Sequence, residues 1–343
     1  MSESRMAKGE HAEEALRYYF LSLGYYVVRG VPFSYHGIDI TDVDLWLYLR
    51  SSSVSRERVC VDIKNKKTPQ AIERVFWGKG LQQVLKLEKC IVATTDNRKE
   101  TRDFGALHDV TVLSGDFVQR IIKKVSSIRE RIEEEALLVA LGAPCVTNSD
   151  INWRRYYRES KQNLLLKLNF DGCNYYFDRI RFLLEECLAT SFSVPPLRLL
   201  YMHLSMFLVT LDYSTRNLAP YDIETIKQII ADGFRFGAAG KERADEIVNT
   251  ALQILTSTRK EDLFSKSSIE TEIKRQLEGY PAELLAEYFA KHDVMKLLFE
   301  FARECEKIAY LSTPPKTTEV SSQIKSLLGL LCDFFKIDRK AVI

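Results

Sequence analysis

Three carboxylates and a lysine border two apolar segments, "DVDLWLYL" and "VCVDIK", at places where an ordinary core strand avoids charge. Asp42 and Asp44 are two residues apart, as are Asp62 and Lys64. Residues two apart on a β-strand point to the same face of the sheet, so each pair shares one face. If the two strands are neighbours, Asp44, Asp62 and Lys64 converge at one end of a sheet.

Such a cluster needs a compensating cation, because like charges raise each other's pKa and burial disfavours the ionised form of every carboxyl. Mg²⁺ suits this position in phosphodiester chemistry. It binds oxygen ligands, requires few protein carboxylates, and keeps positions for water and a phosphate oxygen. Lys64 would then stabilise charge that develops on the phosphate, or assist proton transfer from the attacking water. The pattern predicts a phosphodiester-hydrolysing site that uses Mg²⁺ or Mn²⁺.

Each residue of the cluster also has a structural interpretation. Asp44 could accept hydrogen bonds at a strand end, and Asp42 could either support the site or cap a loop. Asp62 and Lys64 could form a surface ion pair, which contributes little to stability. The apolar "VCV" immediately before Asp62 indicates burial and therefore favours the catalytic interpretation.

The elements that position these residues read α-β-β-β-α-β-β-α over residues 1 to about 125. This order predicts a mixed α/β domain built on one central sheet. A loop containing Pro32 and Gly37 is expected before the strand "VDLWLYL". Thr68 and Pro69 are expected to open a helix that runs to about Lys89.

Strand signals nearly vanish after about residue 127. Two domains are therefore predicted, residues 1–126 and an all-helical region of residues 127–343 that carries no chemical motif. The helical region is expected to bind a partner, regulate the site or form an oligomer. Its helices are expected near 129–141, 175–190, 196–213, 221–233, 240–256, 281–308 and 318–336.

Composition narrows the classes of function. The net charge of +2 excludes a polycation, so a nucleic-acid surface must be a local patch. Seven cysteines without a C-x-x-C pair indicate a reducing compartment. The most apolar run, "LRLLYMHLSMFLVTL", contains Arg198 and His203 and is shorter than the ~20 residues that cross a bilayer. With no secretory signal recognised, we expect a cytoplasmic protein that does not contact a membrane.

The stretch of about residues 8 to 122 resembles the PD-(D/E)XK nuclease superfamily, the restriction-endonuclease-like fold. Asp44 matches the first acid of the motif, with Val43 in place of the proline that names it. Asp62-Ile63-Lys64 matches the second half. The opening "KGEHAEEALRYYFLSLGYYVVR" resembles archaeal Holliday-junction resolvases and Mrr-type restriction enzymes, in which a helical glutamate follows a glycine by four residues. Glu13 follows Gly9 by four residues and occupies that position.

The resemblance implies a metal-dependent endonuclease that acts on DNA, and by analogy a role in bacterial or archaeal defence. Two alternatives stay open: a nucleic-acid-binding module without catalysis, and a scaffold protein that acts through its helical region. On the helix after the site, Trp77 is expected in the core and Gln82 or Gln83 near the site. The resemblance implies that Asp44, Asp62, Glu13 and the main-chain carbonyl of Ile63 bind the metal. Catalysis would involve the same acids together with Lys64. Asp42 would support the site, and Lys66 and Lys67 would contact phosphates.

Overall fold

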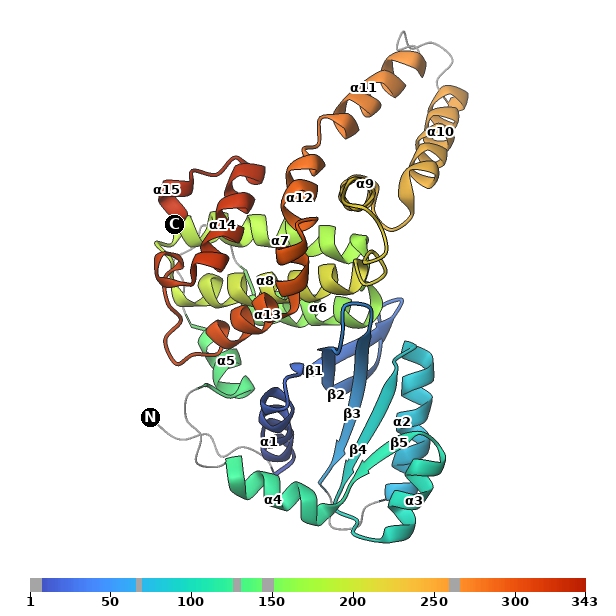
Figure 1. The fold of residues 1–343 in the computed structure, drawn as a ribbon, viewed down its shortest axis with the longest axis vertical. Helices are drawn as coiled ribbons and strands as arrows, with labels where there is room; N and C mark the ends of the chain where they lie inside the picture. The colour runs from blue at the N-terminus through green and yellow to red at the C-terminus, as the bar shows by residue number, and fades with distance from the viewer. Residues whose placement is uncertain (1–7, 66–69, 126–130, 144–150, 259–265) are drawn as a thin grey trace.

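A five-stranded mixed sheet forms the centre of the N-terminal part of the chain (Figure 1). The computed structural model describes residues 8–65, 70–125, 131–143, 151–258 and 266–343. The strands lie in chain order; β1, β2 and β3 are antiparallel, whereas β3, β4 and β5 are parallel. The predicted mixed α/β class is therefore confirmed. The strands are β1 (Tyr26–Tyr35), β2 (Ile38–Arg50), β3 (Arg56–Lys64), β4 (Lys89–Thr94) and β5 (Val110–Leu113).

Helices cover both faces of the sheet. α1 (Lys8–Ser22) and α4 (Gly115–Val125) pack on one face, where their apolar residues share a core cluster with Leu45, Val59 and Val61. α2 (Ala71–Leu85) and α3 (Lys99–Leu107) pack on the other face. α3 was not predicted. It has only nine residues, most of them polar or charged, and buries only two of them, so its sequence offers few apolar positions to recognise.

The hairpin of β1 and β2 is longer than expected: the predicted loop is confirmed at Gly37 but wrong at Pro32, which lies in β1. β1 continues through Pro32 to Tyr35, because an edge strand tolerates a residue without an N–H donor. The turn is only His36-Gly37, whose φ angles of 48° and 83° suit a tight two-residue hairpin turn. Residues 38–44 of β2 pair with β1 alone, so the arm projects beyond the rest of the sheet.

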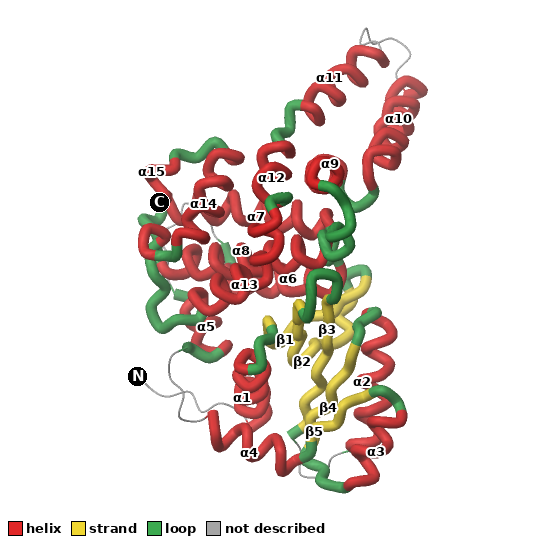
Figure 2. The backbone as a smooth tube through the Cα atoms, viewed as in Figure 1, coloured by secondary structure: helices red, strands yellow, loops and turns green. Residues whose placement is uncertain are grey.

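The remainder of the described chain is helical (Figure 2). α8 (Val194–Ser214) is apolar and long enough to cross a membrane, but 94% of its most apolar window is buried inside the protein. The single helix expected over 281–308 is two helices, because Lys291 adopts an extended conformation between them. α6 and α11 were not predicted. The helices are α5 (Glu134–Leu141), α6 (Trp153–Leu166), α7 (Phe170–Ala189), α8 (Val194–Ser214), α9 (Ile223–Phe236), α10 (Gly240–Thr258), α11 (Lys266–Glu278), α12 (Ala282–Phe289), α13 (His292–Ala309), α14 (Ser322–Phe335) and α15 (Arg339–Val342).

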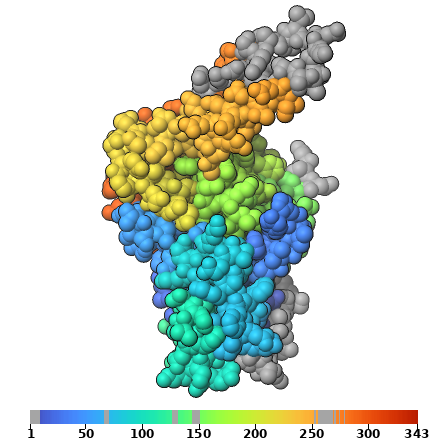
Figure 3. All heavy atoms as spheres, turned by 90° about the vertical axis from the view of Figure 1, so that its right-hand side faces the viewer, coloured from blue at the N-terminus to red at the C-terminus, as the bar shows by residue number. Residues whose placement is uncertain are grey.

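The helical region sits directly on one end of the sheet (Figures 1 and 3). Tyr26, Trp46 and Tyr48 of β1 and β2 belong to the same apolar core cluster as the buried side chains of α8. The Tyr26 hydroxyl also lies 2.9 Å from the Ser205 hydroxyl of α8. One continuous core therefore joins the sheet to the helices.

A buried ionic cluster forms a second contact between the sheet domain and the helical region. The Arg17 side chain of α1 is fully buried and pairs with Glu306 of α13 at 3.0 Å and Glu134 of α5 at 3.6 Å. Lys161 of α6 also pairs with Glu134, at 3.0 Å. Burial opposes ionisation of the Glu134 carboxyl, but the charges of Lys161 and Arg17 prevail and lower its pKa to about 2. The charges compensate one another, so α1 is fixed against the helical region.

Candidate active site

Asp44 and Asp62 lie on neighbouring strands where β2 and β3 separate. The ladder between these strands has its last pair at Leu45 and Val61, and Asp44 and Asp62 are the next residues in that register. Beyond the ladder, the Asp44 carboxylate accepts a hydrogen bond from the backbone N–H of Ile63, with a donor–acceptor distance of 2.6 Å. A side chain thus replaces the backbone carbonyl as the partner of this N–H group, which fixes the Asp44 carboxylate beside β3.

Lys64 lies two residues beyond Asp62, at the C-terminal end of β3, where it pairs in register with Thr94 of β4. Its ammonium group is close enough to Asp44 to lower the pKa of that carboxyl. The structure therefore brings together the three residues that the sequence predicted to converge.

Arg74 compensates the charge of Asp62, a role that the sequence interpretation did not assign. Asp62 is only 7% exposed, and both of its carboxylate oxygens accept hydrogen bonds from the Arg74 guanidinium group. The Nε–Oδ2 distance is 2.7 Å. Arg74 follows the start of α2 by three residues, so a basic residue in the first turn of the helix after the motif was the available signal. The inference that this carboxylate pair requires a metal to remain ionised is thus incorrect for Asp62.

Among the described residues, no side chain pairs with Asp44 as Arg74 pairs with Asp62. Burial raises the pKa of its carboxyl, against the opposing effects of the Ile63 hydrogen bond and the positive charges of Lys64 and Arg74. Within the described residues, no group donates a hydrogen bond to its Oδ1 atom. The carboxylate therefore retains an uncompensated preference for a further cation.

Glu13 reaches the same region from α1. Its Oε2 atom accepts a hydrogen bond of 2.8 Å from Arg29 Nε, so part of its ligand capacity is already used. Burial raises the pKa of Glu13, and the nearby negative charge of Asp44 raises it further. Arg29 also pairs with Glu135 of α5 at 2.7 Å, which ties Glu13 to the helical region.

The remaining predicted residues contribute less to the described site. Asp42 is exposed, and its carboxylate lies 4.0 Å from the Arg158 guanidinium group of α6. Its charge still raises the pKa of Asp44. Lys66 and Lys67 lie outside the described residues, as do Thr68 and Pro69.

Trp77 and Gln82 of α2 do not take the positions expected from the sequence. Trp77 is 44% exposed and lies beside Arg74, whose guanidinium carbon is 5.5 Å from the ring centroid. It is therefore a surface aromatic residue and not a core residue. Gln82 is buried and donates to the carbonyls of Leu87 and Glu88, where it closes the end of the helix.

The oxygen donors that could hold a divalent cation here are few. No group of three or more His, Cys, Asp or Glu side chains in the described residues could hold a metal. Mg²⁺, however, is commonly bound through one or two carboxylates and several waters. Asp44, Asp62 and the main-chain carbonyl of Ile63 could supply such a set once Asp62 releases Arg74.

Comparison of the chain with protein-family models, with curated proteins and with solved structures gives no match. The resemblance to a nuclease superfamily consequently depends on the motif residues alone.

Proposed function

We propose that this protein is a metal-dependent endonuclease of the PD-(D/E)XK type, with a restriction-endonuclease-like fold, that hydrolyses DNA. The observation that carries the proposal is the position of Asp44 and Asp62 on neighbouring strands, with Lys64 two residues further along β3. A separating strand pair that presents two carboxylates and a lysine offers both cation ligands and a positive group for a phosphate.

Each residue has a distinct role in the proposed reaction. Asp44, Asp62 and the Ile63 carbonyl would hold Mg²⁺ or Mn²⁺, with Glu13 as a further acidic residue. The bound ion supplies charge stabilisation and a more acidic water molecule. Lys64 places its ammonium group where negative charge develops on the scissile phosphate. Before the ion binds, Arg74 holds the Asp62 carboxylate in place by its paired hydrogen bonds, and the ion would then displace it.

The helical region would contribute a partner-binding or oligomer-forming surface and rigidity. It contacts α1 through the cluster of Arg17, Glu134 and Glu306, and it reaches Glu13 through Arg29 and Glu135. These contacts give the helices a direct influence on the position of the acidic residue from α1.

A second candidate is a nucleic-acid-binding module that lacks catalysis. The pairing of Arg74 with Asp62 favours it, because a guanidinium group that permanently occupies this carboxylate excludes a metal ligand. Calorimetry separates the two candidates. Mg²⁺ or Mn²⁺ binding to the wild type that disappears in Asp62→Ala supports the enzyme, and the absence of binding to both proteins supports the module.

The activity itself is tested on supercoiled, linear and single-stranded DNA, and on RNA, with Mg²⁺, Mn²⁺ or EDTA. We expect DNA cleavage that requires a divalent cation and that is lost in Asp62→Asn. The matched control is Glu88→Gln, which neutralises an exposed acidic residue at the other end of the sheet and should cleave at the wild-type rate. Complete resistance of every substrate across the metal titration would contradict the proposal.

A further inference from the structure

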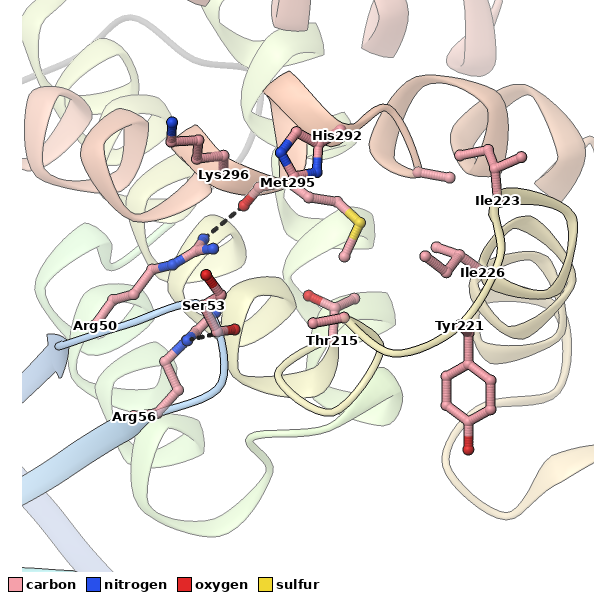
Figure 4. Close-up of a pocket in the computed structure, with 12 residues that line it drawn as sticks. Arg50, Ser53, Arg56, Thr215, Tyr221, Ile223, Ile226, His292, Met295 and Lys296 are labelled. Atoms are coloured by element: carbon pink, nitrogen blue, oxygen red, sulfur yellow. Dashed lines mark hydrogen bonds between the residues drawn. The ribbon is translucent and has the colours of Figure 1, made fainter.

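A second pocket lies at the opposite end of β2 and β3 from the candidate active site. It has a volume of about 400 Å³ and forms where the turn between these strands meets the helical region (Figure 4). Arg50 and Arg56 come from the strands, whereas His292 and Lys296 come from α13. The pocket therefore belongs to neither part of the chain alone.

The wall of this pocket is positively charged. Arg50 and Arg56 both pair with the buried Asp212 of α8, at 2.8 Å and 2.5 Å. Because Arg50 and Arg56 share the single carboxylate of Asp212, one of their two positive charges has no carboxylate partner among the described residues. Lys296 adds another, since no carboxylate among the described residues forms an ion pair with it.

The lining of this pocket contains no Asp or Glu. α13, a helix of 18 residues, also begins here, at His292. The N-terminus of a helix carries partial positive charge, and its unpaired N–H groups favour an anion. Arg50 donates to the Met295 carbonyl at 2.6 Å, so its guanidinium group is held against the first turn of this helix (Figure 4).

The facing wall is apolar and partly exposed. Ile223 and Ile226 of α9 lie opposite Met295, and Tyr221 continues this wall (Figure 4). Ile223 is 46% exposed and Tyr221 is 53% exposed, although both line the pocket. A ligand with an anionic end and a flat apolar part would cover both walls at once.

We propose that this pocket binds a small phosphorylated ligand of the size of a nucleoside monophosphate. The phosphate contacts Arg50, the start of α13 and Lys296, and the base packs on Ile223 and Tyr221. The volume falls within the roughly 300–1,000 Å³ of small-molecule sites. Arg50 lies six residues from Asp44 along β2, a separation of about 20 Å at 3.3 Å per residue, so the site is distinct from the candidate active site.

Binding would connect the sheet to the helical region. Arg50 is the last residue of β2 and Arg56 is the first residue of β3, the strands that carry Asp44 and Asp62. Other residues that line the pocket come from α9 and α13. A ligand that contacts both walls stabilises the interface between the sheet and the helical region, so it raises the melting temperature of the full-length protein.

The test is calorimetric titration of the four common nucleoside 5′-monophosphates into full-length protein, with orthophosphate and adenosine as separate arms. At least one monophosphate should bind with a Kd below about 1 mM and more tightly than either fragment. Lys296→Glu and Ile223→Glu each place negative charge in the pocket and should weaken binding at least tenfold. Lys307→Glu, an exposed lysine further along α13 that does not line this pocket, is the matched control and should retain wild-type affinity.

Melting temperatures of all four proteins accompany the titration, so that loss of folding is separated from loss of binding. The proposal is overturned if none of the monophosphates binds, or if Lys296→Glu and Ile223→Glu both bind like the wild type. It is also overturned if Lys307→Glu loses affinity to the same extent as the two pocket variants.

Discussion

Replacement of Arg74 by alanine tests how the candidate site balances its charge. The Asp62 side chain is 8% exposed, and its partner Arg74 is 23% exposed. Loss of one partner from a fully buried pair costs about 3–5 kcal/mol, because the other charge stays buried without compensation. Partial exposure of Arg74 reduces this to about 2 kcal/mol. In EDTA, Arg74→Ala should therefore melt roughly 3 °C below the wild type.

Mg²⁺ should reverse this loss if Asp62 belongs to a metal site. A ligand at 100 times its Kd stabilises the folded state by about 2.7 kcal/mol, which is close to the expected cost of the substitution. The wild type should gain less from Mg²⁺, because the ion must displace Arg74. The assay is thermal melting of both proteins in EDTA and across a Mg²⁺ titration.

Two controls accompany this experiment. Adding Asp62→Asn to Arg74→Ala should restore stability in EDTA and weaken the response to Mg²⁺, since residue 62 then carries no buried charge without a partner. Arg102→Ala changes an exposed arginine on α3 and should behave like the wild type. A Mg²⁺ response of Arg74→Ala no larger than that of the wild type would refute the assignment of Asp62 as a metal ligand.

Two further predictions concern pH. The pKa of Asp44 is raised in the folded state, so its ionised form costs stability, and this cost grows as pH rises through that pKa. Asp44→Asn should consequently melt above the wild type at pH 7 in EDTA, with the difference vanishing in acid. A variant that melts lower at pH 7 would contradict this. Glu134, with a pKa of about 2, contributes stability that is lost as pH falls from about 4.5 toward 2. Glu134→Gln should lower stability at pH 7 by about 3 kcal/mol, because Arg17 and Lys161 lose a buried partner, and should flatten acid unfolding between these pH values. Equal slopes for both proteins would refute the role of Glu134.

The motif residues could be placed from the sequence because strand periodicity is a local property. The spacing of Asp62 and Lys64, together with the apolar segments around them, sufficed to predict that they share a strand and meet Asp44. Arg74 was missed because its position depends on how α2 packs against β3, which no local pattern specifies. The extension of β1 through Pro32 was missed for the opposite reason. A local breaker signal was overridden by the tolerance of an edge strand.

In the helical region, too, features set by local sequence were predicted, whereas those set by tertiary packing were missed. α8 was placed correctly because it is apolar along its length, whereas α11 and α6 are rich in charged and polar residues. The ionic cluster of Arg17, Glu134 and Glu306 joins residues more than 100 positions apart, which sequence spacing cannot reveal. The pocket between the sheet and α13 was missed for the same reason.

Cleavage of DNA by Lys64→Ala, compared with the wild type at one metal concentration, tests the central claim most directly. In the proposed reaction Lys64 acts on the transition state, so its loss should raise the barrier by about 3 kcal/mol and slow cleavage by roughly a hundredfold. DNA affinity should change little, because it comes from many phosphate contacts. Lys89→Ala, on the neighbouring strand β4 but at the far end of the ladder, is the control and should cleave normally. If Lys64→Ala folds and cleaves DNA as fast as the wild type, the motif is a coincidence and the site is not catalytic.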